Sequence, residues 1–314
     1  MRGELSPKLT DFIATVNVAA KAFKSSGQTL TTEQARLNLQ KLSAFVTKVP
    51  EISFIADKEI RHETLSVPVR LFSPDTQRPL PVLVYFHGGG HMCGDIELYD
   101  PMCRKLAIHS HCHVVAVEYR RSPEHPYPCG LVDAEITIKN IQLVLGDVQH
   151  NGQIFIAGDS AGGAICTSIL MRQTSYGSIL SGVTIDKQIL IYPSVDYTGS
   201  TGSYIENGTG YLLENNRIKW YFDHYFTANE DRKLASPLFG PLPENYPKTL
   251  IITAGCDPLR DEGLAYLERL ITKGVETQHV QFEGMIHAFM NIEDLVPDEC
   301  QSLYSEISRF VQAE

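Results

Sequence analysis

The sequence predicts an α/β fold, in which a mostly parallel central sheet is covered by helices on both faces. From residue 81 onward, short apolar runs typical of buried strands alternate with segments long enough to form helices. Glycines directly follow two of these runs, in "YFHGGG" (residues 85–90) and "IAGDSAGG" (residues 156–163). Because strands that alternate with helices form parallel sheets, we expect helices on both faces of this sheet.

The first 80 residues precede this alternation and carry other patterns. Residues 1–50 indicate two helices, since apolar side chains from Leu9 to Phe23 recur at helical spacing and Thr31 with Gln34 forms a capping box. Residues 51–61 and 67–73 resemble two strands joined as a hairpin. The predicted elements that follow are strands at 81–86, 113–120, 153–157, 188–193, 249–255 and 276–284, and helices at 101–110, 129–146, 164–171, 259–274 and 300–314.

An insertion interrupts the alternating pattern between residues 194 and 247. Its centre, residues 215–232, predicts an aromatic-rich helix between loops rich in glycine and proline. A core helix of the main domain is the alternative, but the flanking loops favour an inserted cap. We therefore predict a helical cap built from residues 1–50 and 194–247, over an α/β-hydrolase catalytic domain formed by residues 51–193 and 248–314.

The composition limits the classes of partner. The chain has 314 residues and a net charge of −10, which argues against nucleic acid or an anionic membrane surface as the main partner. It contains no run of about 18 apolar residues and begins without the apolar stretch of a secretory signal. The seven cysteines are scattered without a C-x-x-C pair, which is typical of reduced thiols. We expect a cytoplasmic protein.

The glycine-rich segment around Ser160 has the form of a nucleophile elbow. A strand that turns sharply into a helix strains the residue at the corner, and this residue needs small neighbours. Gly158-x-Ser160-x-Gly162 supplies them, as in an α/β-hydrolase. A phosphate-binding loop would need Lys and then Ser or Thr after its last glycine, and a dinucleotide fingerprint would need G-x-G-x-x-G. Neither pattern is present.

Partners for this serine are expected at the ends of later strands. A serine hydroxyl needs a histidine to accept its proton and a carboxylate to orient that histidine, in the chain order Ser, Asp or Glu, His. Asp257 and His287 each follow a predicted strand, so both are expected at the sheet edge that carries Ser160. The competing carboxylates are Asp261, Glu262 and Asp196.

The glycines at 88–90 are candidates for an oxyanion hole. A tetrahedral intermediate needs fixed N–H donors, and consecutive glycines allow backbone N–H groups to point inward. These glycines end a predicted strand, and Ala161 after the elbow serine adds a further N–H. A flexible loop is the alternative interpretation.

Five motifs in order resemble the hormone-sensitive-lipase family, in its bacterial GDSAG branch. They are "HGGG" at 87–90, "YRRSPEHPYP" at 119–128, "GDSAGG" at 158–163, "DPLRDEG" at 257–263 and "HAF" at 287–289. The resemblance implies a carboxylesterase with nucleophile Ser160, acid Asp257 and base His287. Arg121-Ser122 departs from the family's usual Leu-Ala. The oxyanion donors implied are the N–H groups of Gly89, Gly90 and Ala161, and the substrate-binding residues expected are His87, Gly88, His91, Asp159, Trp220 and Ile286.

The function predicted is hydrolysis of soluble short- to medium-chain carboxylic esters through an acyl-enzyme on Ser160. We expect no cofactor and no metal, a small-molecule ester as partner, no nucleic acid, no membrane, and a homodimer. An amidase or lactonase of the same fold is the first alternative. The second is a non-catalytic receptor, since plant gibberellin receptors resemble this family but lack the catalytic histidine. The presence of His287 argues against a receptor.

A metal site is the remaining alternative. The segment "HSHCH", residues 109–113, contains three histidines and a cysteine, all possible ligands of zinc or copper. It joins a predicted helix to a predicted strand, where neighbouring side chains diverge, so the sequence favours a metal-free protein.

Overall fold

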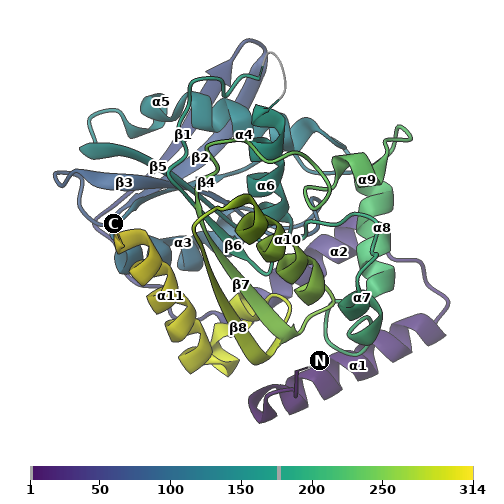
Figure 1. The fold of residues 1–314 in the computed structure, drawn as a ribbon. Helices are drawn as coiled ribbons and strands as arrows, with labels where there is room; N and C mark the ends of the chain where they lie inside the picture. The colour runs from purple at the N-terminus through teal and green to yellow at the C-terminus, as the bar shows by residue number, and fades with distance from the viewer. Residues whose placement is uncertain (1–2, 175–177, 314) are drawn as a thin grey trace.

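The computed structural model describes residues 3–174 and 178–313, and within them an eight-stranded sheet forms the centre of the molecule (Figure 1). The strand order is β1-β2-β4-β3-β5-β6-β7-β8. β2 runs antiparallel to both neighbours and the remaining pairs are parallel, so the predicted hairpin and the mostly parallel sheet are confirmed. The strands are β1 Phe54–His62, β2 Leu65–Ser73, β3 Leu80–Phe86, β4 His113–Val117, β5 His150–Asp159, β6 Lys187–Ile191, β7 Lys248–Cys256 and β8 Thr277–Ile286.

Helices cover both faces of this sheet, as the sequence predicted. Side chains alternate along each strand, so in β3 Leu83 joins one apolar cluster and Val84 joins the other. The first cluster is completed by α3 (Ile96–Ser110) and α11 (Pro297–Gln312). The helices of the second face are α4 Cys129–Lys139, α5 Ile141–Leu145, α6 Ala161–Gln173 and α10 Arg260–Lys273. Short 3₁₀ helices are η1 Pro7–Leu9, η2 Lys41–Phe45 and η3 Phe289–Leu295.

Two predicted helices are shorter than the sequence pattern indicated. The segment 129–146 is divided into α4 and α5 at Asn140, whose side-chain amide donates a 2.9 Å hydrogen bond to the carbonyl of Ile136. Asparagine competes with helical hydrogen bonding in this way. The aromatic helix α8 (Asn215–Tyr225) ends before Phe226, which has extended backbone angles.

The N-terminal helices and the inserted segment lie on the same side of the molecule (Figure 1). α1 (Thr10–Ser25) and α2 (Thr32–Gln40) are drawn in purple beside α7 (Gly202–Glu206), α8 and α9 (Arg232–Ala235) in green. The predicted capping box of α2 is confirmed, because Thr31 and Gln34 exchange side-chain hydrogen bonds with each other's backbone N–H. The Asn17 amide of α1 donates to the carbonyl of Gly210, which connects the two segments directly.

Within the described residues no disulfide joins any of the seven cysteines, and six of them are buried. No helix in residues 3–174 and 178–313 is long and apolar enough to span a bilayer.

Candidate active site

Ser160 occupies the turn between β5 and α6 with strained backbone angles, φ 52° and ψ −116°. Residues other than glycine rarely adopt these backbone angles, and their presence points to a functional constraint. Close packing around the turn requires glycine on both sides. A Cβ at Gly158 would lie 2.3 Å from the carbonyl carbon of Gly162, and a Cβ at Gly162 would lie 1.8 Å from the carbonyl oxygen of Phe86. The elbow therefore packs directly against the end of β3.

The structure brings Ser160, Asp257 and His287 together. Asp257 is the first residue after β7 and His287 the first after β8, so the sheet brings them to the edge where β5 ends. Nε2 of His287 lies 2.8 Å from the Ser160 hydroxyl, and Nδ1 lies 2.7 Å from Oδ2 of Asp257. All three side chains are buried. With Nδ1–H donating to the carboxylate, Nε2 is free to accept the serine proton.

The carboxylates that competed with Asp257 in the sequence bind other partners. Asp196 accepts hydrogen bonds from hydroxyl groups two and four residues further along the chain. Glu262 accepts hydrogen bonds from the backbone N–H groups of Val195 and Asp196, which follow β6. Burial raises the pKa of Glu262 well above its ordinary value. Asp261 forms an ion pair with Arg260. None of these three carboxylates is hydrogen-bonded to the buried histidine in the described part of the chain.

The loop of residues 87–95, which we call the oxyanion loop, carries the predicted N–H donors. Gly89 and Gly90 have positive φ angles of 118° and 64°. The Gly89 carbonyl accepts the N–H groups of Met92 and Cys93, which closes a tight turn. Among the described residues, no acceptor binds the N–H groups of the two glycines. Ala161 is the first residue of α6, where an N–H has no partner within the helix.

A buried carboxylate connects the elbow to the oxyanion loop. One oxygen of Asp159 accepts the Tyr85 hydroxyl and the Gly88 N–H, both at 2.7 Å, and the other accepts the Tyr99 hydroxyl at 3.1 Å. Burial raises the pKa of Asp159 to about 6, although these donors oppose the shift. Asp159 and Gly88 were expected to bind substrate, and the structure pairs them with each other. The two tyrosines carried no sequence signal, because each lies at least 60 residues from Asp159.

His87, the first residue of the same loop, is buried between two aromatic rings. Its ring stacks on Tyr119 with a centroid distance of 4.4 Å and on Tyr99 at 5.4 Å. Its Nδ1 donates to the carbonyl of Gly88 at 2.8 Å. Burial lowers the pKa of His87 to about 4, so the ring is neutral at pH 7.

His91, in the middle of the same loop, contacts the inserted segment. Its ring stacks on Tyr225 of α8 with a centroid distance of 3.9 Å and an interplanar angle of 2°. Its Nε2 lies 3.2 Å from the hydroxyl of Tyr197. Burial lowers the pKa of His91 to about 3, so it too is neutral at pH 7.

The last two predicted substrate-binding residues differ in their surroundings. Ile286 ends β8 and is buried immediately before the histidine. Trp220 of α8 packs with Ala35 of α2 and with Met92 and Cys93 of the oxyanion loop. Contact of either side chain with a substrate stays a prediction.

The histidines at 109–113 do not converge. His109 stacks on Tyr304, whereas His113 is hydrogen-bonded to Ser73 and to the carbonyl of Gln149. Within residues 3–174 and 178–313, no three His, Cys, Asp or Glu side chains are grouped so that they could bind a metal ion.

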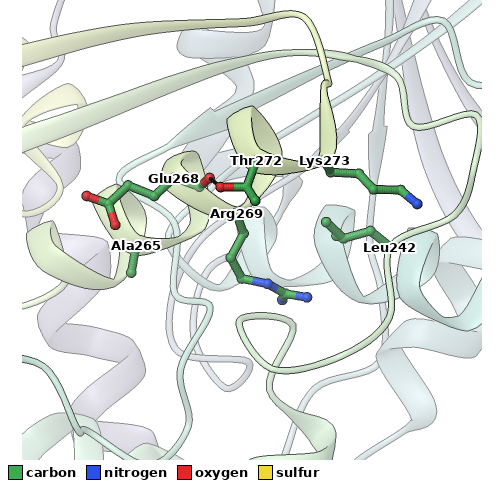
Figure 2. Close-up of a pocket in the computed structure, with 6 residues that line it drawn as sticks. All are labelled: Leu242, Ala265, Glu268, Arg269, Thr272 and Lys273. Atoms are coloured by element: carbon green, nitrogen blue, oxygen red, sulfur yellow. Dashed lines mark hydrogen bonds between the residues drawn. The ribbon is translucent and has the colours of Figure 1, made fainter.

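A hollow of about 500 Å³ lies elsewhere, along the outer side of α10 (Figure 2). Figure 2 shows Arg269 pointing from this helix toward the loop that carries Leu242. The Arg269 guanidinium is already bound to the carbonyls of Pro237 and Gly240, so it supports the wall of the hollow. The lining residues are Leu242, Ala265, Glu268, Arg269, Thr272 and Lys273, and none belongs to the predicted site.

Sheet order, elbow and the hydrogen-bonded Ser, His and Asp side chains define the class of this protein as an α/β hydrolase. A family described as having the alpha/beta hydrolase fold matches residues 83–291, and the chain belongs to this family. The predicted fold class and family resemblance are thereby confirmed.

Two similar enzymes match nearly the whole chain, and a similar receptor matches most of it. Ethyl acetate hydrolase of Pseudomonas putida is 30% identical over 98% of this chain and 99% of its own. A solved esterase of Pyrobaculum calidifontis is 32% identical, with a TM-score of 0.84 and 98% of each chain covered. A gibberellin receptor of Arabidopsis thaliana is 31% identical over 81% of this chain and 72% of its own.

Proposed function

We propose that this protein is a serine carboxylesterase that hydrolyses short- to medium-chain esters through an acyl-enzyme on Ser160. The observation that carries the proposal is the continuous chain of hydrogen bonds from Ser160 through His287 to Asp257, at 2.8 and 2.7 Å. The names of the similar ethyl acetate hydrolase and esterase support the reaction class, hydrolysis of carboxylic esters.

In the first half-reaction, the Ser160 oxygen attacks the ester carbonyl carbon while its proton passes to Nε2 of His287. Negative charge develops on the former carbonyl oxygen, and the N–H groups of Gly89, Gly90 and Ala161 stabilise it. The bond between the carbonyl carbon and the alcohol oxygen then breaks, and the leaving alcohol takes the proton from the histidine. The product is an acyl ester on the serine.

The second half-reaction repeats these steps with water as the nucleophile. His287 accepts a proton from water as the water oxygen attacks the acyl carbon. The bond to the Ser160 oxygen breaks, the serine regains its proton from the histidine, and the carboxylic acid leaves. Asp257 keeps its charge and stabilises the imidazolium at both steps.

The proposal includes a cap over the site, formed by residues 1–50 and 194–247. Its support is the packing of Trp220 and Tyr221 against the oxyanion loop. On its outer side, α8 carries an exposed ion pair between Lys219 and Asp223 at 2.6 Å, which suits contact with water rather than with an oil surface. The cytoplasmic location and the homodimer stay predictions.

A series of p-nitrophenyl esters from acetate to palmitate tests the substrate class. Each buried CH₂ contributes about 0.8 kcal/mol, or about fourfold in binding, until the pocket is full. We expect the highest kcat/KM at roughly two to eight acyl carbons, given the usual size of small-molecule sites. We also expect no increase in rate where the substrate passes its solubility limit. A maximum at palmitate, or a sharp rise with emulsion, would identify a lipase instead.

A non-catalytic receptor is the second candidate, because a gibberellin receptor is among the similar proteins. Turnover of p-nitrophenyl acetate separates the two functions, since a receptor has no need of a serine hydrogen-bonded to histidine. Parallel assays with anilides and lactones distinguish the esterase from an amidase or a lactonase.

A further inference from the structure

The oxyanion loop lies between two helices that are far apart in the sequence. From α8, Tyr221 packs on Gly90 so closely that a Cβ at this glycine would lie 2.6 Å from the tyrosine ring. From α2, Ala35 joins the apolar cluster that contains Met92 and Cys93. The position of this loop therefore depends on both halves of the proposed cap.

Arg36 of α2 makes the polar part of this contact. Its Nε donates to the carbonyl of Met92 at 3.0 Å, and its Nη2 donates to the carbonyl of Ser122 at 3.1 Å. Both Nη atoms bind the carboxylate of Glu124, at 2.9 and 2.7 Å. One guanidinium thus joins α2, the oxyanion loop and the segment 119–128. Its rigid planar fork fixes all of these directions at once.

A second set of hydrogen bonds fixes the neighbouring peptide. The N–H and the hydroxyl of Ser122 both donate to the carbonyl of His91, at 2.9 and 3.1 Å. Ser122 and Arg36, which lie outside the loop, therefore bind the carbonyls of His91 and Met92. The Gly89 carbonyl instead accepts hydrogen bonds from within the loop and closes the turn. Because a peptide is planar, these two carbonyls fix the N–H groups of Met92 and Cys93, which both donate to the Gly89 carbonyl. That carbonyl lies in the same peptide plane as the N–H of Gly90, so its direction is fixed as well.

We propose that Arg36 is a positioning residue of the oxyanion hole, through which helix α2 sets the orientation of the Gly90 N–H donor. This inference rests on the proposed esterase function and extends it to a residue of the cap. This donor acts only when it points at the developing oxyanion, so Arg36 contributes mainly to the transition state.

The pairing with Glu124 keeps this contact intact over a wide pH range. The Arg36 guanidinium lowers the pKa of Glu124 to about 2, and an arginine stays protonated throughout the range in which esterases are assayed. We therefore expect a loss of rate on removal of Arg36 that is the same at pH 6 and pH 9.

The test compares R36M, R36K and E124Q with the wild-type enzyme. kcat and KM are measured on p-nitrophenyl butyrate, and active sites are counted by stoichiometric reaction with a p-nitrophenyl phosphonate. The matched control is R232M. Arg232 of α9 is also paired with a carboxylate, that of Asp223 at 2.8 Å, but this pair is separate from the hydrogen bonds that bind the oxyanion loop.

For R36M we expect kcat to fall about 10- to 100-fold while KM changes less than about threefold, since misplacing donors by about 1 Å has effects of this size. The rate of phosphonylation should fall in parallel, because its transition state also places negative charge on an oxygen. R36K keeps the charge without the fork and should lose about fivefold or more in kcat. E124Q should lose about two- to threefold, and R232M should match the wild type.

Three results would overturn the proposal. An R36M variant with wild-type kcat and a lowered melting temperature would show that Arg36 only stabilises the fold. A raised KM with unchanged kcat would place Arg36 in substrate binding. A wild type without ester turnover would refute both the esterase function and this inference. If the wild type is active and R36M keeps its kcat, only the inference about Arg36 fails. Should R36M fail to fold, R36K provides the test: a lower kcat with little change in KM supports the proposal, and an unchanged kcat refutes it.

Discussion

The sheet edge and the proposed cap position their candidate functional groups in different ways. At the sheet edge, Ser160, Asp257 and His287 each directly follow a strand, so the hydrogen-bonded backbone determines where they lie. In the cap, Arg36 and Tyr221 reach the oxyanion loop through long side chains from separate helices. The sheet edge therefore depends on many shared backbone contacts, whereas the cap depends on a few side chains.

This difference separates two kinds of mutational effect. We expect that removing one of the three groups at the sheet edge removes a chemical step that no neighbour can replace. We expect that changing a residue of the proposed cap alters only the orientation or the stability of a chemically complete site.

The largest effect is expected for Ser160→Ala. Without the hydroxyl no acyl-enzyme forms, and turnover should fall by about 10⁴-fold or more, as for other serine hydrolases. The measurement is the kcat for p-nitrophenyl butyrate, with folding checked by circular dichroism. Ser168→Ala is the matched control and should keep wild-type activity, because Ser168 is also buried but lies about two turns into α6. A Ser160→Ala enzyme with a tenth of the wild-type rate would refute the assignment.

Asp257→Asn should have the next largest effect, about 10³- to 10⁴-fold in kcat, because an amide in place of the carboxylate favours the wrong histidine tautomer. Asp196→Asn is the comparison, since Asp196 also lies at this sheet edge but accepts hydrogen bonds from hydroxyl groups instead. It should lower the melting temperature and leave kcat within about threefold of the wild type. Equal losses of kcat in both variants would contradict the assignment of Asp257.

The contrast also explains what the sequence could predict. The strands and the elbow follow from local patterns, because an apolar run followed by glycine specifies both the element and its turn. Ser160, Asp257 and His287 could be chosen because each has a fixed position relative to a strand. The geometry joins them as expected, and competitors such as Glu262 turn out to bind backbone N–H groups.

The contacts between the proposed cap and the oxyanion loop could not be predicted from the sequence. Arg36 and Met92 are 56 residues apart, and no period or motif relates an arginine on a helix to a carbonyl in a distant loop. The same holds for Tyr85 and Asp159, which are 74 residues apart. The break at Asn140 was missed for a different reason, because the apolar pattern continues through a residue whose side chain binds the carbonyl of Ile136 and whose backbone angles are not helical.

His91 lies at the boundary between the two regions, and its burial predicts how stability depends on pH. Its ring contacts Tyr225 and Tyr197, and the charged form is disfavoured by burial and by the nearby His87. The ordinary pKa of 6.5 applies to the unfolded chain, whereas the pKa in the folded protein is about 3. Below pH 6.5 the unfolded state therefore binds a proton that the folded state does not, and stability falls as the pH decreases.

The smallest predicted effect, on stability rather than on chemistry, is tested with His91→Asn. Asparagine tolerates the positive φ of 60° at this position and does not titrate. Between pH 7 and pH 5 we expect the wild type to lose about 2 kcal/mol more unfolding free energy than the variant.

His87, with its pKa lowered to about 4, adds a loss of the same sign, and Asp159, with its pKa raised to about 6, opposes it. Both remain in the variant, so they cancel in the difference. Urea denaturation at each pH measures it, with His111→Asn as the control, because His111 is exposed and also has a positive φ. Identical pH dependence in the wild type and His91→Asn would show that His91 is accessible to protons, and that the proposed cap does not exclude water from this part of the oxyanion loop.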